Sequence, residues 1–104
     1  MATVQFSVRA EEDLLNIGAY TLRQWGERQA ARYLDDLDHC ASMLAVNPAI
    51  GRACGWVRSG LYRFEQGRHV LFYRKITSGI RVVRILHQSM LPDRHGFDDS
   101  DTGS

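Results

Sequence analysis

The stretch LYRFEQGRHVLFYRKITSGIRVVRILH, residues 61–87, contains three segments rich in β-branched and aromatic residues, separated by glycine-containing turns. Such segments, bounded by Gln66-Gly67 and Ser78-Gly79, predict three antiparallel strands joined by two tight turns. The third segment is apolar at both odd and even positions, which is typical of a strand inside a sheet. The three predicted strands are Leu61–Glu65, His69–Ile76 and Ile80–Leu86.

Upstream of these strands, the spacing of the apolar residues changes to three and four, which predicts two helices. Ser7 is suited to cap the first helix, whose opening turns carry three acids that the helix dipole favours. Gly26 ends this helix, and Asn47-Pro48 ends the second. Because only one glycine joins the two helices, they are expected to form an antiparallel hairpin.

Before the hairpin, Thr3–Val8 alternates between polar and apolar residues and predicts a further strand. The predicted order is one strand, a helical hairpin and a three-stranded antiparallel meander. This order indicates an α+β fold with the helices packed on one face of the sheet. The side chains expected in the core are Leu14, Ile17, Trp25, Tyr33, Leu37, Leu44, Phe72, Val83 and Ile85.

The composition fits one small globular domain. Of the 104 residues, 44% are hydrophobic and 24% are charged, which excludes a disordered chain, a collagen and a disulfide-rich miniprotein. Residues 1–96 are assigned to the domain, and residues 97–104, with three aspartates, are expected to be a flexible acidic tail. There is no apolar run long enough for a membrane helix and no signal-peptide pattern. A cytoplasmic location without membrane contact is therefore expected.

The sequence contains none of the short motifs of nucleotide, metal or hydrolase sites. A phosphate-binding glycine loop, His-Glu-x-x-His and Gly-x-Ser-x-Gly are all missing. Cys40, Cys54, His69 and His87 are too scattered to predict a zinc site, so neither a metal nor a cofactor is expected. One core thiol and one loop thiol are expected to be free, although the sequence leaves an internal disulfide open.

The charges are sorted along the chain although their sum is only +1. Residues 1–50 carry a net charge of −3, residues 51–96 carry +7, and residues 97–104 carry −3. Twelve of the thirteen basic residues are arginines, which suit planar, bidentate recognition of carboxylates and phosphates. The basic second half predicts an anionic partner, either nucleic acid or an acidic protein surface.

Cationic and aromatic residues on the predicted strands are the candidates for partner contact. If the strand faces align, Arg63, Tyr73, Arg81 and His87 converge at the sheet. Arginines that hold a phosphate, with a histidine or tyrosine to transfer protons, suit a metal-free ribonuclease. The alternative is that these side chains only complete the core and the strand ends. The candidates are Arg63, His69, Tyr73, Arg74, Arg81 and His87.

Several segments, taken together in their order and spacing, carry a resemblance over nearly the whole domain. They are Ala10–Ile17, Trp25–Ala30, Tyr33 with Leu34 and Leu37, Asn47–Arg52, GRHVLFYR at 67–74, VRILHQSM at 83–90 and Asp93–His95. The two strand segments are the most specific. With these segments the sequence resembles the ParE toxins, within the RelE/ParE superfamily of bacterial toxin–antitoxin modules.

The resemblance implies a toxin without enzymatic activity that blocks DNA gyrase, traps its cleaved complex with DNA and halts replication. It also implies a ParD-like antitoxin, which pairs a ribbon-helix-helix DNA-binding dimer with a C-terminal segment that wraps the toxin. Direct DNA binding by the toxin alone is not expected. The basic strands offer a seat for an acidic antitoxin segment, and an amphipathic helix in a groove beside the hairpin is the expected binding mode. Trp25 would then line this groove instead of the core.

Two alternatives differ in class from a gyrase inhibitor. One is a RelE-like, ribosome-dependent mRNA endoribonuclease that uses Arg63, Arg81 and His87, since one fold hosts both activities. The other is a non-toxic relative that only binds an antitoxin. This second alternative arises because Leu91-Pro92 stands before Asp93, where ParE-like chains commonly carry an acid directly after the position of Met90.

Overall fold

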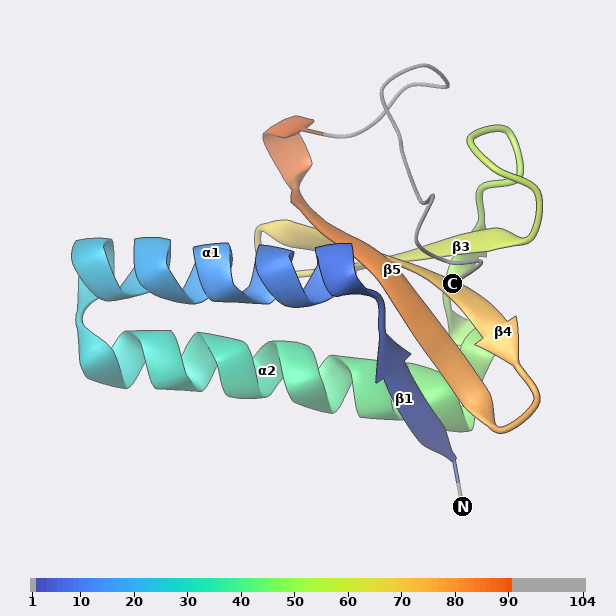
Figure 1. Ribbon diagram of the computed structural model, residues 1–104, viewed down its shortest axis with the longest axis horizontal. Coiled ribbons are helices and arrows are strands. Elements are labelled where there is room, and N and C mark those ends of the chain that lie inside the picture. Colours follow the sequence, from blue (N-terminus) through green and yellow to red (C-terminus); the bar gives the residue numbers. More distant parts are fainter. Residues whose placement is uncertain (1, 91–104) are drawn as a thin grey trace.

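The computed structural model describes residues 2–90, in which a helical hairpin packs against a five-stranded sheet (Figure 1). The strand order is β1-β5-β4-β3-β2, with β1 parallel to β5 and the other neighbours antiparallel. This arrangement confirms the predicted α+β class. The elements are β1 (Thr3–Phe6), α1 (Val8–Trp25), α2 (Glu27–Val46), the 3₁₀ turn η1 (Pro48–Ile50), β2 (Arg52–Ala53), β3 (Leu61–Gln66), β4 (His69–Ile76), β5 (Gly79–His87) and the 3₁₀ turn η2 (Gln88–Met90).

The helical hairpin begins, turns and ends at the residues that the sequence indicates. The Ser7 side chain accepts a hydrogen bond from the Ala10 amide at 3.0 Å, so it caps α1. Gly26 has a φ of 88°, a conformation that favours glycine, and α2 begins at the next residue. The second helix stops at Val46, two residues before Pro48.

The sheet is buried on both faces. The inner face packs against α1 and α2 and carries Leu71, Tyr73, Val82 and Ile85, all at most 3% exposed. The outer face has a second cluster of buried apolar residues. Besides strand residues, it contains Cys54 and Val57 from the loop between β2 and β3. Strand β5 contributes to both clusters and has a neighbour on each side, so its predicted place inside the sheet is confirmed.

A β-bulge in β5 reverses the alternation of its side chains. Val82 lies opposite Tyr73, and Arg84 lies opposite Phe72, so Val83 is an extra residue without a partner of its own in the ladder. As a result, two odd-numbered residues, one before the bulge and one after it, point to opposite faces of the sheet. The same holds for two even-numbered residues. Strict alternation along β5 therefore gives a wrong placement for the residues beyond it.

Two further expectations about the elements need correction. The first strand ends at Phe6, not Val8, because Ser7 leaves the strand to cap α1. Trp25 is 64% exposed and is not a core residue, since it ends α1 beyond the edge of the sheet. The short strand β2 and the parallel pairing of β1 with β5 were not predicted.

Both cysteines are free and buried. Cys40 lies on α2 in the inner core, and burial raises the pKa of its thiol to about 11. Cys54 is 0% exposed in the outer cluster, so the expected loop thiol is also a packed residue. Thiols in such surroundings stay protonated and are poor nucleophiles at neutral pH.

Over residues 2–90, neither helix has a stretch long and apolar enough to cross a membrane. The acidic tail predicted at 97–104 lies outside the described residues.

Candidate functional site

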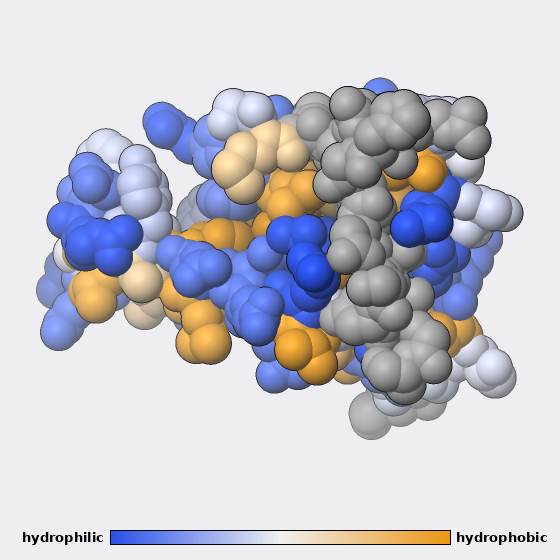
Figure 2. Space-filling model, turned by 45° about the horizontal axis from the view of Figure 1, so that its top comes forward, coloured by the Kyte–Doolittle hydropathy of each residue, from blue (hydrophilic) through white to orange (hydrophobic). Residues whose placement is uncertain are grey.

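A groove of about 770 Å³ runs between the helical hairpin and the ends of β4 and β5. Three apolar side chains on its walls are largely exposed: Tyr20 at 55%, Trp25 at 64% and Met90 at 61%. Large apolar side chains that stay exposed in a concave site mark a place for a ligand or partner. The view in Figure 2 shows hydrophobic patches lying between strongly hydrophilic side chains across one face of the molecule.

A hydrogen-bonded pair of rings forms part of the groove wall. The Arg68 amide donates to Tyr33 Oη at 3.1 Å, and Tyr33 Oη lies 2.5 Å from His69 Nδ1. With the hydroxyl donating to Nδ1, the neutral imidazole keeps its proton on Nε2, a tautomer assigned from these contacts. Burial raises the pKa of the Tyr33 hydroxyl. The pair therefore joins α2 to the turn between β3 and β4.

His69 is held in its neutral form. Burial, followed by the neighbouring His87, lowers the pKa of His69 to about 4. The two imidazole rings meet edge to face with their centroids 5.3 Å apart. His87 Nδ1 accepts from the Ser89 amide at 3.1 Å and lies 2.7 Å from Ser89 Oγ. At neutral pH the wall formed by His69 is thus an uncharged aromatic surface, not a cationic one.

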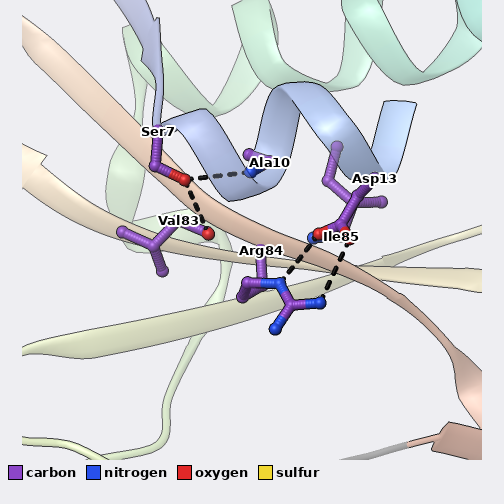
Figure 3. Close-up of polar contacts among 6 residues, drawn as sticks. All are labelled: Ser7, Ala10, Asp13, Val83, Arg84 and Ile85. Carbon is purple, nitrogen blue, oxygen red and sulfur yellow. Dashed lines mark hydrogen bonds and ion pairs between the residues drawn. The ribbon is translucent and has the colours of Figure 1, made fainter. Parts of the chain in front are cut away.

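The N-terminal part of α1 is hydrogen-bonded to β5 just after the residues of β5 that pair with β1 (Figure 3). Ser7 Oγ donates to the Val83 carbonyl at 2.8 Å, and the Asp13 carboxylate accepts from the Ile85 amide at 2.9 Å. The same carboxylate accepts two bonds from the Arg84 guanidinium, at 2.9 and 3.1 Å. Because the Asp13 and Arg84 side chains are only 13% and 18% exposed, this bidentate pair is shielded from water. The contacts fix the wall of the groove formed by α1 and β5.

The six predicted contact residues do not gather at one place. His69 and His87 line the groove. Tyr73 is 0% exposed under the helices and donates a hydrogen bond to the Pro48 carbonyl at 2.7 Å, so its expected position at the sheet surface is wrong. The remaining three, Arg63, Arg74 and Arg81, lie on the outer face of the sheet. Arg63 lies opposite Phe72, and Arg74 lies between Leu61 on one neighbouring strand and Arg81 on the other; Phe72 and Leu61 belong to the outer cluster.

The convergence of Arg63, Arg81 and His87 is therefore also wrong. The bulge at Val83 is the physical reason, because it places Arg81 on the outer face and His87 on the inner face. Guanidinium groups and an imidazole separated by the thickness of a sheet cannot act on one phosphate.

The outer face carries four arginines on neighbouring strands. Together with Glu65, they are here called the arginine face: Arg52, Arg63, Arg74 and Arg81. Arg52 lies directly opposite Arg63, and Arg74 lies directly opposite Arg81. Glu65 accepts a hydrogen bond from Arg52 at 2.8 Å and lies 3.7 Å from the Arg63 guanidinium. That guanidinium also lies 5.9 Å from the centre of the Phe72 ring. These contacts order the side chains of Arg52, Arg63 and Glu65.

Some residues of the groove were missed by sequence reasoning. Tyr20 received no role, and Arg68 and Met90 were named only within the segments that carry the resemblance. A signal for Tyr20 was its spacing from Ile17, a buried position of α1, because residues three apart are neighbours on a helix surface. Within the described part of the chain, no three histidine, cysteine, aspartate or glutamate side chains are grouped so as to hold a metal ion.

Comparison with known proteins gives consistent relatives. Residues 4–92 match the model of the ParE toxin of the type II toxin–antitoxin system, parDE. Toxin ParE1 of Mycobacterium tuberculosis is 44% identical over 90 residues, which cover 86% of this chain and 92% of the relative. Toxin ParE1 of Caulobacter vibrioides is 37% identical over 95 residues, which cover 91% and 98%.

Solved structures share the fold at low sequence identity. A chain from the chromosomal ParDE toxin–antitoxin system of P. aeruginosa has a TM-score of 0.70 at 18% identity, covering 84% of this chain and 96% of the other. A chain of the toxin–antitoxin complex RelBE2 from Mycobacterium tuberculosis has a TM-score of 0.63 at 21% identity, covering 83% and 96%. The family match, the two relatives and the shared architecture agree, and the chain belongs to the ParE toxin family of type II toxin–antitoxin systems.

Proposed function

We propose that the chain inhibits DNA gyrase as a binding protein without catalytic activity of its own, and that a ParD-like antitoxin neutralises it by placing an amphipathic helix in the groove. Membership of the ParE family supports gyrase as the target. The observation that carries the antitoxin site is the groove itself, with Tyr20, Trp25 and Met90 exposed along it. The solved neighbours come from toxin–antitoxin systems, which supports an antitoxin as the partner.

The groove has the chemistry that an amphipathic helix needs. Its apolar side chains accept the buried side of such a helix, at spacings of three and four residues. Arg68 at the turn between β3 and β4 also lines the groove, and it can pair with an acidic residue at the rim of the docked helix. His69, neutral at physiological pH, adds an aromatic surface without a charge that must be desolvated.

Truncation of Trp25 tests the antitoxin site. We expect Trp25→Ala to weaken the binding of the cognate antitoxin about 30-fold, because a buried tryptophan anchor contributes roughly 2 kcal/mol. Trp56→Ala is the matched control, since Trp56 is 59% exposed and does not line the groove. Isothermal titration calorimetry of the two variants with the antitoxin gives both dissociation constants. Equal weakening by the two substitutions, or none by Trp25→Ala, would reject the groove as the antitoxin site.

The endoribonuclease alternative has lost its geometric support, because Arg81 and His87 lie on opposite faces of the sheet. It is tested in cells with the double substitution Arg81→Ala and His87→Ala. If toxicity disappears in a variant that still folds and binds the antitoxin, and mRNA is cut on translating ribosomes by the unmodified chain, the ribonuclease reading replaces gyrase inhibition. If the double variant remains toxic, the ribonuclease hypothesis is rejected. Growth without arrest by the unmodified chain would instead favour a non-toxic, antitoxin-binding relative.

A further inference from the structure

Strand β1 has one edge that is open for pairing. It is the last strand on its side of the sheet, and within residues 2–90 only β5 pairs with it. The amides of Thr3 and Ser7 donate to carbonyls just before and within β5, at 2.8 and 2.9 Å. Because successive amides of a strand point to opposite sides, the amides and carbonyls of Val4 and Phe6 face the open edge.

The two edges of the sheet differ in their chemistry. At the opposite edge, β2 has only two residues, and the Arg52 side chain is 73% exposed. Short strands and charged side chains are usual protections of an edge against pairing with another chain. Strand β1 reads Thr-Val-Gln-Phe, without a charge or a proline, and its register with β5 is regular. Its open edge can therefore accept an added strand.

A second groove, here called the hairpin groove, lies beside this edge and has a volume of about 420 Å³. It lies between α1 and α2, and Figure 1 shows both helices continuing past the open edge of β1. Leu15 is 75% exposed on its wall, and the groove shares only Ile85 with the one proposed for the antitoxin. The apolar residues that line the hairpin groove are Phe6, Leu14, Leu15, Leu34, Leu37 and Ile85.

Two carboxylates stand on the walls of the hairpin groove. Glu11 on α1 and Asp38 on α2 both line it, and both residues are exposed. Within the described residues, neither of them forms an ion pair. An apolar surface between two acids complements a ligand that carries an apolar side chain between two basic ones. A second copy of this chain lacks that pattern, because it would bring the uncharged β1 and another pair of acids to the same place.

We propose that the open edge of β1 and the hairpin groove together bind an extended segment of a partner protein that carries the pattern basic–x–apolar–x–basic. The backbone of the segment pairs with Val4 and Phe6 as a sixth strand. Its apolar side chain packs beside Leu15, and its basic side chains pair with Glu11 and Asp38. Alternate residues of a strand share a face, which sets the two basic residues about 13 Å apart. The inference needs only the fold and depends on neither gyrase nor the antitoxin.

An NMR titration of the full chain with the end-blocked peptide Thr-Lys-Thr-Leu-Thr-Lys-Thr tests the pairing. In the saturated complex we expect hydrogen exchange of the Val4 and Phe6 amides to slow by about tenfold or more, because both face the added strand. The Thr3 and Ser7 amides, which are already hydrogen-bonded, should change little. Unchanged exchange at Val4 and Phe6 would overturn the proposal. Equal binding of a peptide with glutamate in place of lysine would also overturn it.

Truncation of Leu15 tests the groove. Leu15→Ala should weaken binding of the peptide about fivefold, because it removes apolar surface that the peptide covers. Leu22→Ala is the matched control, since Leu22 is 48% exposed on the same helix and does not line the hairpin groove. If the two variants bind the peptide equally well, the peptide does not occupy the groove, and the proposal is wrong.

Two double substitutions separate the acids of the groove from net charge. Glu11→Gln/Asp38→Asn should weaken binding of the peptide about tenfold at low salt and have less effect at about 0.5 M NaCl, where screening is strong. Glu12→Gln/Asp36→Asn makes the same change in net charge at exposed positions outside the groove and should leave the affinity unchanged. Equal affinities of the two variants would contradict recognition by Glu11 and Asp38.

The variant Val4→Pro tests whether a second copy occupies the edge. Proline removes an amide from the open edge and leaves the hydrogen bonds to β5 in place, so peptide binding should be lost. Without peptide, light scattering should give the same oligomeric state for Val4→Pro and for the unmodified chain. A dimer of the unmodified chain that Val4→Pro dissociates would assign the edge to a second copy and overturn the proposal.

Discussion

The two faces of the sheet are built on different physical principles. The inner face lies under two helices, and its polar groups are paired: Tyr73 with the Pro48 carbonyl, and Tyr33 with His69. Among the described residues, the outer face packs against a short loop and sets arginines opposite arginines, and Glu65 pairs with two of them, Arg52 and Arg63. The inner face therefore holds the larger of the two apolar clusters, with its polar groups paired inside it. The outer face combines a second apolar cluster with charged side chains, of which Arg52 is 73% exposed and Arg63 only 17%.

The largest expected effect comes from a cavity in the inner face. Leu44→Ala, at a position that is 0% exposed, should lower the free energy of unfolding by about 3 kcal/mol, because it removes apolar contacts and leaves a void. Leu15→Ala on the exposed side of α1, where Leu15 is 75% exposed, is the matched control and should change it by less than about 0.5 kcal/mol. Urea denaturation measures both. Similar losses in the two variants would mean that the hairpin does not pack as described.

Removal of the Asp13 carboxylate should have the next largest effect. Asp13→Ala leaves the Arg84 guanidinium and the Ile85 amide without their acceptor, so we expect a loss of roughly 2 kcal/mol. A double-mutant cycle with Arg84→Met isolates the ion pair, and the two losses should be clearly less than additive. Strict additivity would show that the two side chains do not interact in solution.

The buried histidine of the groove makes stability depend on pH. The pKa of His69 is lowered to about 4 in the folded chain, below its ordinary value near 6.5, so the unfolded chain binds a proton first as the pH falls. Its contribution is complete above about pH 6.5 and is lost as the pH falls toward 4, with a slope of at most about 1.4 kcal/mol per pH unit. In His69→Gln this part of the slope should disappear, whereas His39→Gln, at an exposed position of α2, should keep it. Unfolding curves between pH 4 and 7 decide between the two results.

The smallest effect is expected for an ion pair on the outer face. The side chains of Arg52 and Glu65 are 73% and 57% exposed, and pairs this exposed contribute little. Arg52→Gln should therefore change the free energy of unfolding by less than about 0.5 kcal/mol, and removal of its repulsion from Arg63 offsets part of any loss. A loss above about 1 kcal/mol in the same urea assay would show that the arginine face is also a structural element.

Sequence patterns predicted the elements well because local chemistry sets them. Ser7, Gly26 and Asn47-Pro48 bound the helices through capping and backbone conformation, and the meander follows from its turns. The candidate site was predicted only in part, since it depends on tertiary pairing. The bulge at Val83 has no clear local signal, and it decides which face each candidate of β5 occupies. Burial of Tyr73 likewise depends on its neighbours in space.

Trp25 shows the opposite case. Its spacing on α1 fits the apolar face, so periodicity alone predicts a core residue, yet the helix extends past the sheet and leaves the side chain in the groove. The rule that large apolar residues are buried fails where an element continues beyond the core.

Supercoiling of plasmid DNA by gyrase, with purified antitoxin-free protein, tests the central claim most directly. The account predicts that the folded protein stops supercoiling and that linear DNA accumulates from the trapped cleavage complex. It also predicts that the cognate antitoxin restores supercoiling for the unmodified protein, but only at a higher concentration for Trp25→Ala. Undisturbed supercoiling in an excess of folded, antitoxin-free protein would contradict gyrase inhibition.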